Sequence, residues 1–195
     1  MGMDVCYGVT KVEMLFLQAI RDRIILCCLL AAPGFASVRV SAFVRGSAAV
    51  PALAAGQDTI PRPVGYLNDF EHLFTPGQID TLDRLLHDYE QRTTTEIAVL
   101  TVDSSLTMYA NFDFFTLETM IAWAVGKKEK DNGMLICISR SFRKMRIQNG
   151  SGIEKVLSNA DTKKIIDESF IPFFRKGQYY EGVLNGLKTL MQRLE

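Results

Sequence analysis

The segment Asp131-Asn-Gly-Met-Leu-Ile-Cys-Ile138 places a short acidic turn directly before the apolar run Met134–Ile138. A short apolar run that follows a turn signal is typical of a strand in the interior of a sheet. Upstream, Thr95–Val102 is rich in β-branched residues and predicts a second buried strand. These two strands decide the fold, because everything else in this half of the chain can be placed relative to them.

The segment between the two strands is predicted to be a helix. Phe112, Phe115, Ala122 and Trp123 recur at helical spacing within residues 111–125, and Gly126 is expected to end the helix. A strand, a helix and a strand in this order form a right-handed βαβ unit, whose two strands run parallel.

Further elements follow on both sides of this unit. Arg143–Gln148 alternates apolar and polar residues and predicts an antiparallel edge strand with one solvated face. Three helical segments are expected after it, beginning near Gly152, Asp161 and Tyr179. The fold class is therefore α/β: a three-layer α/β/α sandwich around a small mixed sheet, a variant of the Rossmann-like arrangement.

The clearest single element precedes the βαβ unit. Thr75 suits a helix N-cap, Pro76 suits the first helical position, and Gln78 completes a capping box. The apolar residues that follow recur at helical spacing and predict one face packed on the sheet; they are Ile79, Leu82, Leu85, Leu86 and Tyr89.

Composition bounds the function. The chain has 195 residues, 48% of them apolar, and 22 basic residues balance 22 acidic ones. This balance gives no support to nucleic-acid binding. Gly150-Ser-Gly152 lacks the third glycine of a dinucleotide fingerprint, so no nucleotide cofactor is expected. Cys137 is the one cysteine after residue 28 and is interpreted as a small buried apolar side chain.

The N-terminal segment resembles an export signal. Arg21 and Arg23 precede the apolar run Ile24–Ala32, and small residues allow cleavage after Ala36 or Ala54. An uncleaved membrane anchor is the alternative, although the apolar stretch is shorter than the roughly 18 residues that span a bilayer. Residues 1–54 are thus predicted to be a targeting segment, residues 55–63 a linker and residues 64–195 the folded domain. Little regular structure is expected before about Pro61.

The domain resembles the TPM domain family, whose name derives from thylakoid phosphatase, photosystem II repair and nematode receptor-modulator proteins and which is often labelled TPM phosphatase. The resemblance covers about residues 64–195 and rests on seven short pieces in the family's order. They are Val64-Gly-Tyr-Leu-Asn-Asp-Phe70, Leu73-Phe-Thr75, Thr95-Glu-Ile-Ala-Val-Leu-Thr-Val102, Trp123-Ala-Val-Gly126, Asp131-Asn-Gly-Met-Leu135, Arg146-Ile-Gln-Asn-Gly-Ser-Gly-Ile-Glu154 and Pro172-Phe-Phe-Arg-Lys-Gly-Gln-Tyr-Tyr-Glu-Gly182.

The resemblance implies a cation site. It brings Asp69 and Glu154 near Asp131, and these carboxylates together with Asn132 offer the oxygen ligands that hard cations require. We expect calcium in preference to magnesium. The alternative is that Asp131-Asn-Gly133 is a tight turn and that Asp69 forms an Asx-turn or caps a helix.

Two classes of function remain open. The family label implies a metal-assisted acid phosphatase, in which Arg140, Arg143, Lys144 and Arg146 would stabilise the phosphoryl oxygens. No nucleophile is identified. Cys137 and Arg143 have the spacing of cysteine phosphatases, but the cysteine lies within a predicted strand rather than at a phosphate loop.

The second class is favoured, because the chain has no complete catalytic constellation. It is an exported interaction or maintenance module that acts on an envelope or membrane protein, with any cation serving a structural role.

Overall fold

The computed structural model describes residues 4–6 and 60–195. Its sheet has the strand order β1-β5-β4-β3-β2. The strands are β1 (Asp4–Cys6), β2 (Leu67–Asp69), β3 (Glu96–Thr101), β4 (Gly133–Ser139) and β5 (Lys144–Asn149). β2, β3 and β4 run parallel, and β5 is antiparallel to β4, as the predicted βαβ unit and the turn after it require.

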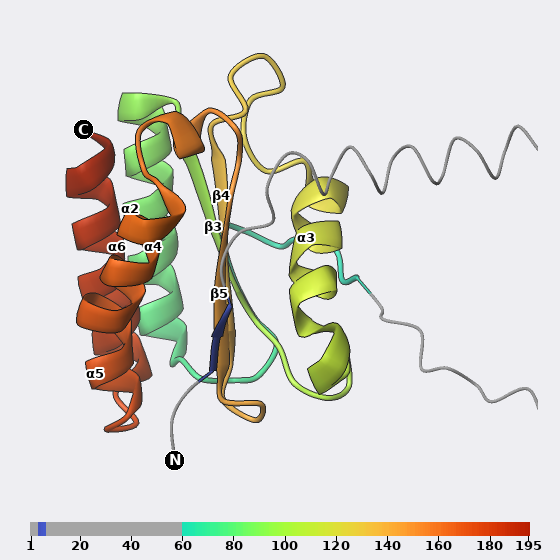
Figure 1. Ribbon diagram of the computed structural model, residues 1–195. Coiled ribbons are helices and arrows are strands. Elements are labelled where there is room, and N and C mark those ends of the chain that lie inside the picture. Colours follow the sequence, from blue (N-terminus) through green and yellow to red (C-terminus); the bar gives the residue numbers. More distant parts are fainter. Residues whose placement is uncertain (1–3, 7–59) are drawn as a thin grey trace, which may run out of the picture. The chain divides into compact units, whose positions relative to one another are not determined.

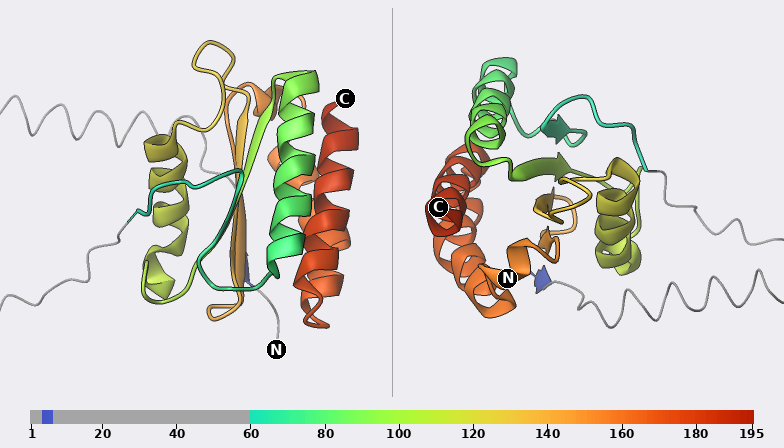
Figure 2. Two further views of the ribbon diagram at one scale, coloured as in Figure 1. Left: turned by 180° about the vertical axis from the view of Figure 1, so that it is seen from behind. Right: turned by 90° about the horizontal axis from the view of Figure 1, so that it is seen from above.

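Helices cover both faces of the sheet, so the molecule has the predicted three layers (Figure 1). Figure 2 shows α3 (Phe112–Trp123) on one face and α2 (Pro76–Thr93) with the C-terminal helices on the other. The C-terminal helices are α4 (Asn159–Ile165), η3 (Ile166–Phe170), α5 (Ile171–Phe174) and α6 (Tyr179–Leu194). Two short 3₁₀ turns complete the set, η1 (Tyr109–Asn111) and η2 (Ile153–Lys155).

The start of α2 confirms the predicted capping box. Thr75 Oγ1 accepts a hydrogen bond from the backbone N–H of Gln78, and the Gln78 side chain accepts one from the N–H of Thr75. Leu82, Leu86 and Tyr89 are fully buried against the sheet. The local signal was sufficient here because each partner lies within one turn of the helix.

The end and the buried face of α3 differ from the prediction. The helix ends at Ala124, which adopts a left-handed conformation with φ of 52°, two residues before Gly126. Ala122, predicted to share the buried face, is exposed, whereas Thr116 and Thr119 are buried. Thr116 can face the sheet because its hydroxyl donates to the carbonyl of Phe112. The buried hydroxyl of Thr119 has no hydrogen-bond partner among the described residues.

The prediction for β5 was correct in pairing and wrong in exposure. β5 is not the edge of the sheet, because β1 pairs with it in parallel with Cys6 opposite Arg146. Lys144, Arg146 and Gln148, expected to face solvent, are all buried. Asp113 of α3 forms an ion pair with Arg146 at 3.3 Å, and Gln148 accepts two hydrogen bonds from the same guanidinium, so the buried charge is compensated.

The C-terminal helical segments contain a π-helical turn that the sequence analysis did not anticipate. It comprises Ile166–Phe170 and directly precedes Pro172. A proline has no N–H to give to the carbonyl four residues earlier and clashes with it, which is a known cause of irregular helical turns. The wider turn packs the Phe170 ring on Gly186 of α6.

The targeting and linker predictions fall mostly outside the described residues. β1 departs from the expectation of little regular structure before Pro61. Among residues 60–195, no helix combines the length and the apolar character that a bilayer span requires.

Candidate functional site

Asp69 is the last residue of β2, not part of a turn, and its carboxylate holds the following loop in place. Oδ1 accepts hydrogen bonds from Leu73 N (3.0 Å) and Thr101 Oγ1 (2.5 Å), and Oδ2 accepts one from Phe74 N (2.9 Å). Because Asp69 lies opposite Thr101 in the register, it is at the carboxyl ends of the parallel strands. Asp69 thus fixes its loop through residues four and five positions further on, and forms neither the Asx-turn nor the helix cap of the alternative prediction, since the N-cap of α2 is Thr75.

Asp131 and Asn132 lie at the other end of the sheet, before the first residue of β4. Asp131 is exposed, has φ of 48° and accepts a hydrogen bond from Ser151 Oγ (2.7 Å). Asn132 is buried; its Oδ1 accepts from Lys127 N (3.0 Å) and its Nδ2 donates to the carbonyl of Thr94 (2.6 Å). Both residues therefore shape the turn that leads into β4.

Glu154 lies in η2, next to the Asp131 turn. Gly152 N donates to the carbonyl of Asp131 (2.9 Å), which brings the start of η2 to the amino end of β4. The structure thus brings Asp131, Asn132 and Glu154 to one end of the sheet and places Asp69 at the other. A side chain at Gly152 would meet the carbonyl oxygen of Lys130 at 2.1 Å, so this close approach requires glycine.

The predicted cation site does not fit as one site. Asp69 is separated from the other three residues and its carboxylate is occupied, and the side-chain oxygen of Asn132 is occupied as well. Among residues 60–195, no three His, Cys, Asp or Glu side chains converge as a cation cage would require. A calcium site at Asp131 and Glu154 alone stays a prediction.

The basic residues predicted to stabilise a phosphoryl group are also divided. Arg140 and Arg143 are exposed in the turn between β4 and β5, at the same end as Asp69. Glu71 fixes this turn by accepting the N–H groups of Arg140 and Ser141, each at 2.7 Å. Lys144 and Arg146 are buried within β5. None of these four basic side chains therefore lies beside Asp131.

Cys137 is buried in the middle of β4, as predicted. Burial raises the pKa of its thiol to about 12, which is opposite to the acidic thiol that cysteine phosphatases need.

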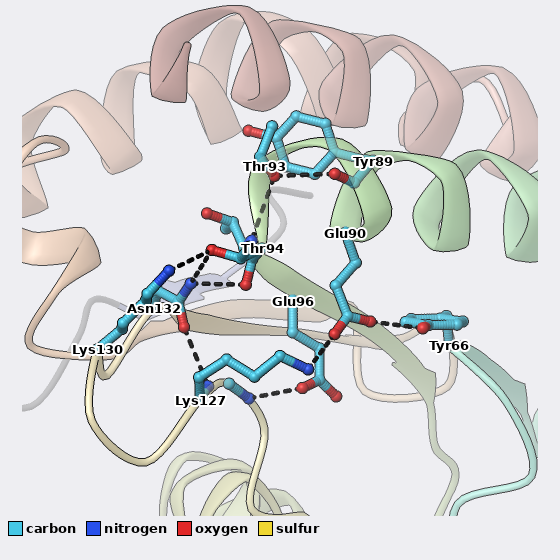
Figure 3. A network of polar contacts seen from close by, with 11 residues as sticks. Tyr66, Tyr89, Glu90, Thr93, Thr94, Glu96, Lys127, Lys130 and Asn132 are labelled. Atoms are coloured by element: carbon cyan, nitrogen blue, oxygen red, sulfur yellow. Dashed lines mark hydrogen bonds and ion pairs between the residues drawn. The ribbon is translucent and has the colours of Figure 1, made fainter.

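A polar network that the sequence analysis missed lies at the amino end of β3 (Figure 3). Its centre is Glu90 of α2, whose side chain is 9% exposed. The Glu90 carboxylate accepts a hydrogen bond from Tyr66 Oη (2.5 Å) and forms an ion pair with Lys127 Nζ. Three segments distant in the sequence thus meet at one buried carboxylate.

Charge coupling moves the pKa values of this network away from neutrality. Burial acts to raise the pKa of Glu90, but the hydrogen bonds from Lys127 and Tyr66 outweigh it and hold that pKa below the ordinary value. The hydrogen bond to Glu90, followed by burial, raises the pKa of Tyr66 to about 12. The same carboxylate raises the pKa of Lys127. All three groups therefore keep one protonation state around pH 7.

The network borders a cleft of about 420 Å³. Glu96 also faces it: its Oε2 accepts a hydrogen bond from Gly126 N (2.9 Å), and its Oε1 accepts none from residues 60–195. Lys127 attracts the Glu96 carboxylate electrostatically. Trp123 lines the cleft, with its indole N–H donated to the carbonyl of Pro61 (2.7 Å). The remaining lining residues are mainly small or apolar; they are Pro63, Val64, Gly65, Ala98 and Val125.

The comparisons with known proteins agree with this architecture. The family model of the TPM domain matches residues 67–193, most of the chain. The chain belongs to the TPM domain family. Comparison with curated protein sequences gives no match.

Three solved structures resemble this TPM domain. The N-terminal domain of a P. gingivalis protein is 29% identical with a TM-score of 0.60, over 66% of this chain and 81% of that one. The BA42 protein of Bizionia argentinensis is 19% identical with a TM-score of 0.53, over 64% and 83%. The N-terminal domain of the cg2496 protein of Corynebacterium glutamicum is 12% identical with a TM-score of 0.51, over 68% and 81%. The last two support the fold alone.

Nothing in the sequence marked the cleft of the TPM domain as a site. Tyr66, Glu90 and Lys127 belong to three separate segments, and none stands in a recognisable motif with another. Seven of the ten lining residues do lie in pieces that carry the family resemblance: Val64, Gly65, Tyr66, Glu96, Ala98, Trp123 and Val125. Only the assembled fold reveals their common position.

Proposed function

We propose that this TPM domain is an exported interaction module that binds a protein of the cell envelope. The observation that carries the proposal is the network of Tyr66, Glu90 and Lys127 beside the cleft. General acid–base catalysis needs a group whose pKa lies near the working pH. This network instead holds fixed charges, which suits recognition of a ligand more than turnover of a substrate.

The edge of the cleft supports recognition of a protein. Val64 is 89% exposed, yet its backbone is held by a hydrogen bond from its N–H to Asn68 Oδ1 (2.7 Å). Asn68 is buried and also donates to the carbonyl of Gly65 (2.8 Å). A single exposed apolar residue is common on monomeric proteins. Val64 supports a contact surface because it lines the cleft beside the charged network.

The proposal that the protein is exported rests on its N-terminal sequence. The basic residues before Ile24–Ala32 and the small residues at Ala36 and Ala54 favour a cleaved signal, and these residues lie outside the described part of the chain. Cleavage at either position would remove β1 and retain β2 to β5, with every residue that lines the cleft.

A metal-assisted acid phosphatase is the alternative. Its candidate carboxylates and cationic groups are distributed over both ends of the sheet, as described above. The family label is the argument that favours it, and a direct assay separates the two functions.

The test combines turnover and crosslinking on the full chain. Hydrolysis of p-nitrophenyl phosphate is measured at acid pH with calcium or magnesium, beside Asp131→Ala. We expect no turnover above the blank. If turnover depends on the metal and is lost in Asp131→Ala, while the free energy of unfolding is unchanged, the protein is a phosphatase and the interaction module is rejected.

The second arm identifies the contact surface. A photo-crosslinking amino acid is introduced in place of Val64 and, as the matched control, in place of Val156, which is also apolar and 59% exposed. In cells of the source organism we expect an adduct with one envelope protein from position 64 and not from position 156. Equal adducts at both positions would show that Val64 has no special role.

A further inference from the structure

The cleft beside Glu90 carries one surplus negative charge. Its lining contains two carboxylates, Glu90 and Glu96, and one ammonium group, Lys127. Lys127 is paired with Glu90, so that the Glu90 charge is compensated inside the protein. Figure 3 shows Glu96 beside this pair, where Lys127 also attracts it, but its Oε1 accepts no hydrogen bond from the described residues. The cleft therefore favours a cation over an anion.

The aromatic wall points to the same kind of ligand. Trp123 has a single hydrogen-bond donor, which the carbonyl of Pro61 already accepts. What remains for a ligand is the indole ring, the aromatic surface that binds organic cations best. A carboxylate next to an indole, with Val125 and Pro63 close by, matches an ammonium or guanidinium group at the end of an aliphatic stem.

The edge of the cleft indicates where the cation comes from. A free small amine would need only the carboxylate and the ring, whereas Val64, which lines the cleft and is 89% exposed, offers further apolar contact at its edge. A volume of about 420 Å³ is enough for one long side chain.

We propose that this cleft binds a lysine or arginine side chain of a partner protein, with Glu96 as the ion-pair partner and Trp123 as the aromatic wall. The proposal rests on the proposed function, because it names the chemistry that the interaction module recognises. It implies that the partner presents a basic residue on an exposed segment.

The single tryptophan of the chain provides the readout. The ¹⁵N-labelled full chain is titrated with N-acetyl-lysine amide, and the indole N–H resonance of Trp123 and the amide resonance of Gly126 are followed. N-acetyl-arginine amide is the second cationic probe. N-acetyl-norleucine amide keeps the aliphatic stem without the charge, and N-acetyl-glutamate amide reverses the charge.

We expect saturable shifts with the lysine and arginine probes, and at most small shifts with the other two. Glu96→Gln should weaken lysine binding about two- to fivefold, the effect expected when a partly exposed ion pair is lost. Glu118→Gln is the matched control, since it removes one negative charge from α3 outside the cleft. It should leave binding unchanged.

Several results would overturn the proposal. If the norleucine and lysine probes shift the Trp123 resonance equally, the cleft is an apolar site. If the glutamate probe binds more tightly than the lysine probe, the cleft binds an anion through Lys127. Butylammonium that binds more tightly than the lysine probe would point to a free amine as the ligand and overturn the protein source of the cation. These results concern ligand binding and not phosphomonoester turnover. If the cleft fails to bind the cationic probes, the proposal of an interaction module is unaffected. Phosphomonoester turnover, in contrast, would contradict the interaction module itself.

Discussion

Asp69 and Asp131 lie at opposite ends of the same sheet. Asp69 is opposite Thr101, the last residue of β3, whereas Asp131 precedes Gly133, which is opposite Glu96, the first residue of β3. Five residue steps of about 3.3 Å, or about 16 Å along the strands, separate Asp69 from the level of Gly133, and Asp131 lies two residues before Gly133. A single ion cannot bind both carboxylates, so the two residues have independent roles.

The first prediction concerns the role of Asp69 in stability. Asp69→Ala removes the acceptor of two backbone N–H groups and of the Thr101 hydroxyl. Hydrogen bonds to a charged acceptor contribute more than neutral ones, so we expect the free energy of unfolding to fall by about 2–3 kcal/mol. Urea denaturation measures this loss.

Asp131→Ala is the control for that experiment, because Asp131 is exposed and, within residues 60–195, its side chain has one hydrogen bond, from the Ser151 hydroxyl. Its loss should be below about 1 kcal/mol. Equal losses in the two variants would contradict the assignment of Asp69 as the residue that fixes its loop.

The second prediction concerns calcium. If the ion binds the Asp131 turn, thermal stability rises with calcium concentration, because a ligand of the native state alone must stabilise it. We expect that rise to disappear in Asp131→Asn and Glu154→Gln and to persist in Asp69→Asn. Scanning calorimetry of the full chain at increasing calcium concentration measures it.

Magnesium serves as the comparison ion in the same scans. A rise that Asp69→Asn abolishes would mean that the two ends of the sheet are coupled by the ion, contrary to the geometry. If thermal stability does not rise at millimolar calcium, the prediction of a calcium site in this domain is wrong.

Local signals predicted most of the fold, and long-range pairing accounts for what was missed. The capping box at Thr75 lies within one helical turn and was read correctly. β2 was missed because Leu67–Asp69 is too short to show a period of two. Asp69 and Asp131 were assigned to one site because of the family resemblance, and without β2 nothing in the sequence placed them at opposite ends of the sheet.

The cleft was missed for a related reason. Glu90 and Lys127 lie 37 positions apart and belong to different elements. Neither side chain is unusual in its own segment, since Glu90 stands in a helix rich in charged residues and Lys127 in a lysine-rich turn. Their pairing depends on the packing of α2 against β3, which is a property of the assembled layers.

The third prediction concerns the packing of the π-helical turn on α6. A Cβ at Gly186 would meet the Phe170 ring at 2.1 Å, and both residues are buried. Gly186→Ala should therefore lower the free energy of unfolding by about 1–3 kcal/mol through overpacking. Urea denaturation gives the value.

Gly77→Ala is the matched control, because Gly77 lies in α2 and nothing stands within 4 Å of the added Cβ. It should be neutral or stabilise the protein by up to about 1 kcal/mol, the difference in helix propensity. A Gly186→Ala variant as stable as the wild type would show that the Phe170 ring can move without cost.

The last prediction concerns the pH range over which the Glu90 network stabilises the protein. The folded pKa of Glu90 lies below its ordinary value of 4.5, so its contribution is present above pH 4.5 and is lost as the pH falls through the folded pKa. The pKa of Tyr66 rises from 10.0 to about 12, so its contribution is present below pH 10 and is lost as the pH rises toward 12.

Urea denaturation from pH 3 to pH 11 tests both limits. We expect the difference in unfolding free energy between wild type and Tyr66→Phe to be about 1 kcal/mol and constant between these limits, since one hydrogen bond is lost. The difference should shrink above pH 10, where the tyrosine of the unfolded chain ionises. A difference that changed near pH 7 would mean that a group of the network titrates there, which would reopen general acid–base catalysis in this cleft.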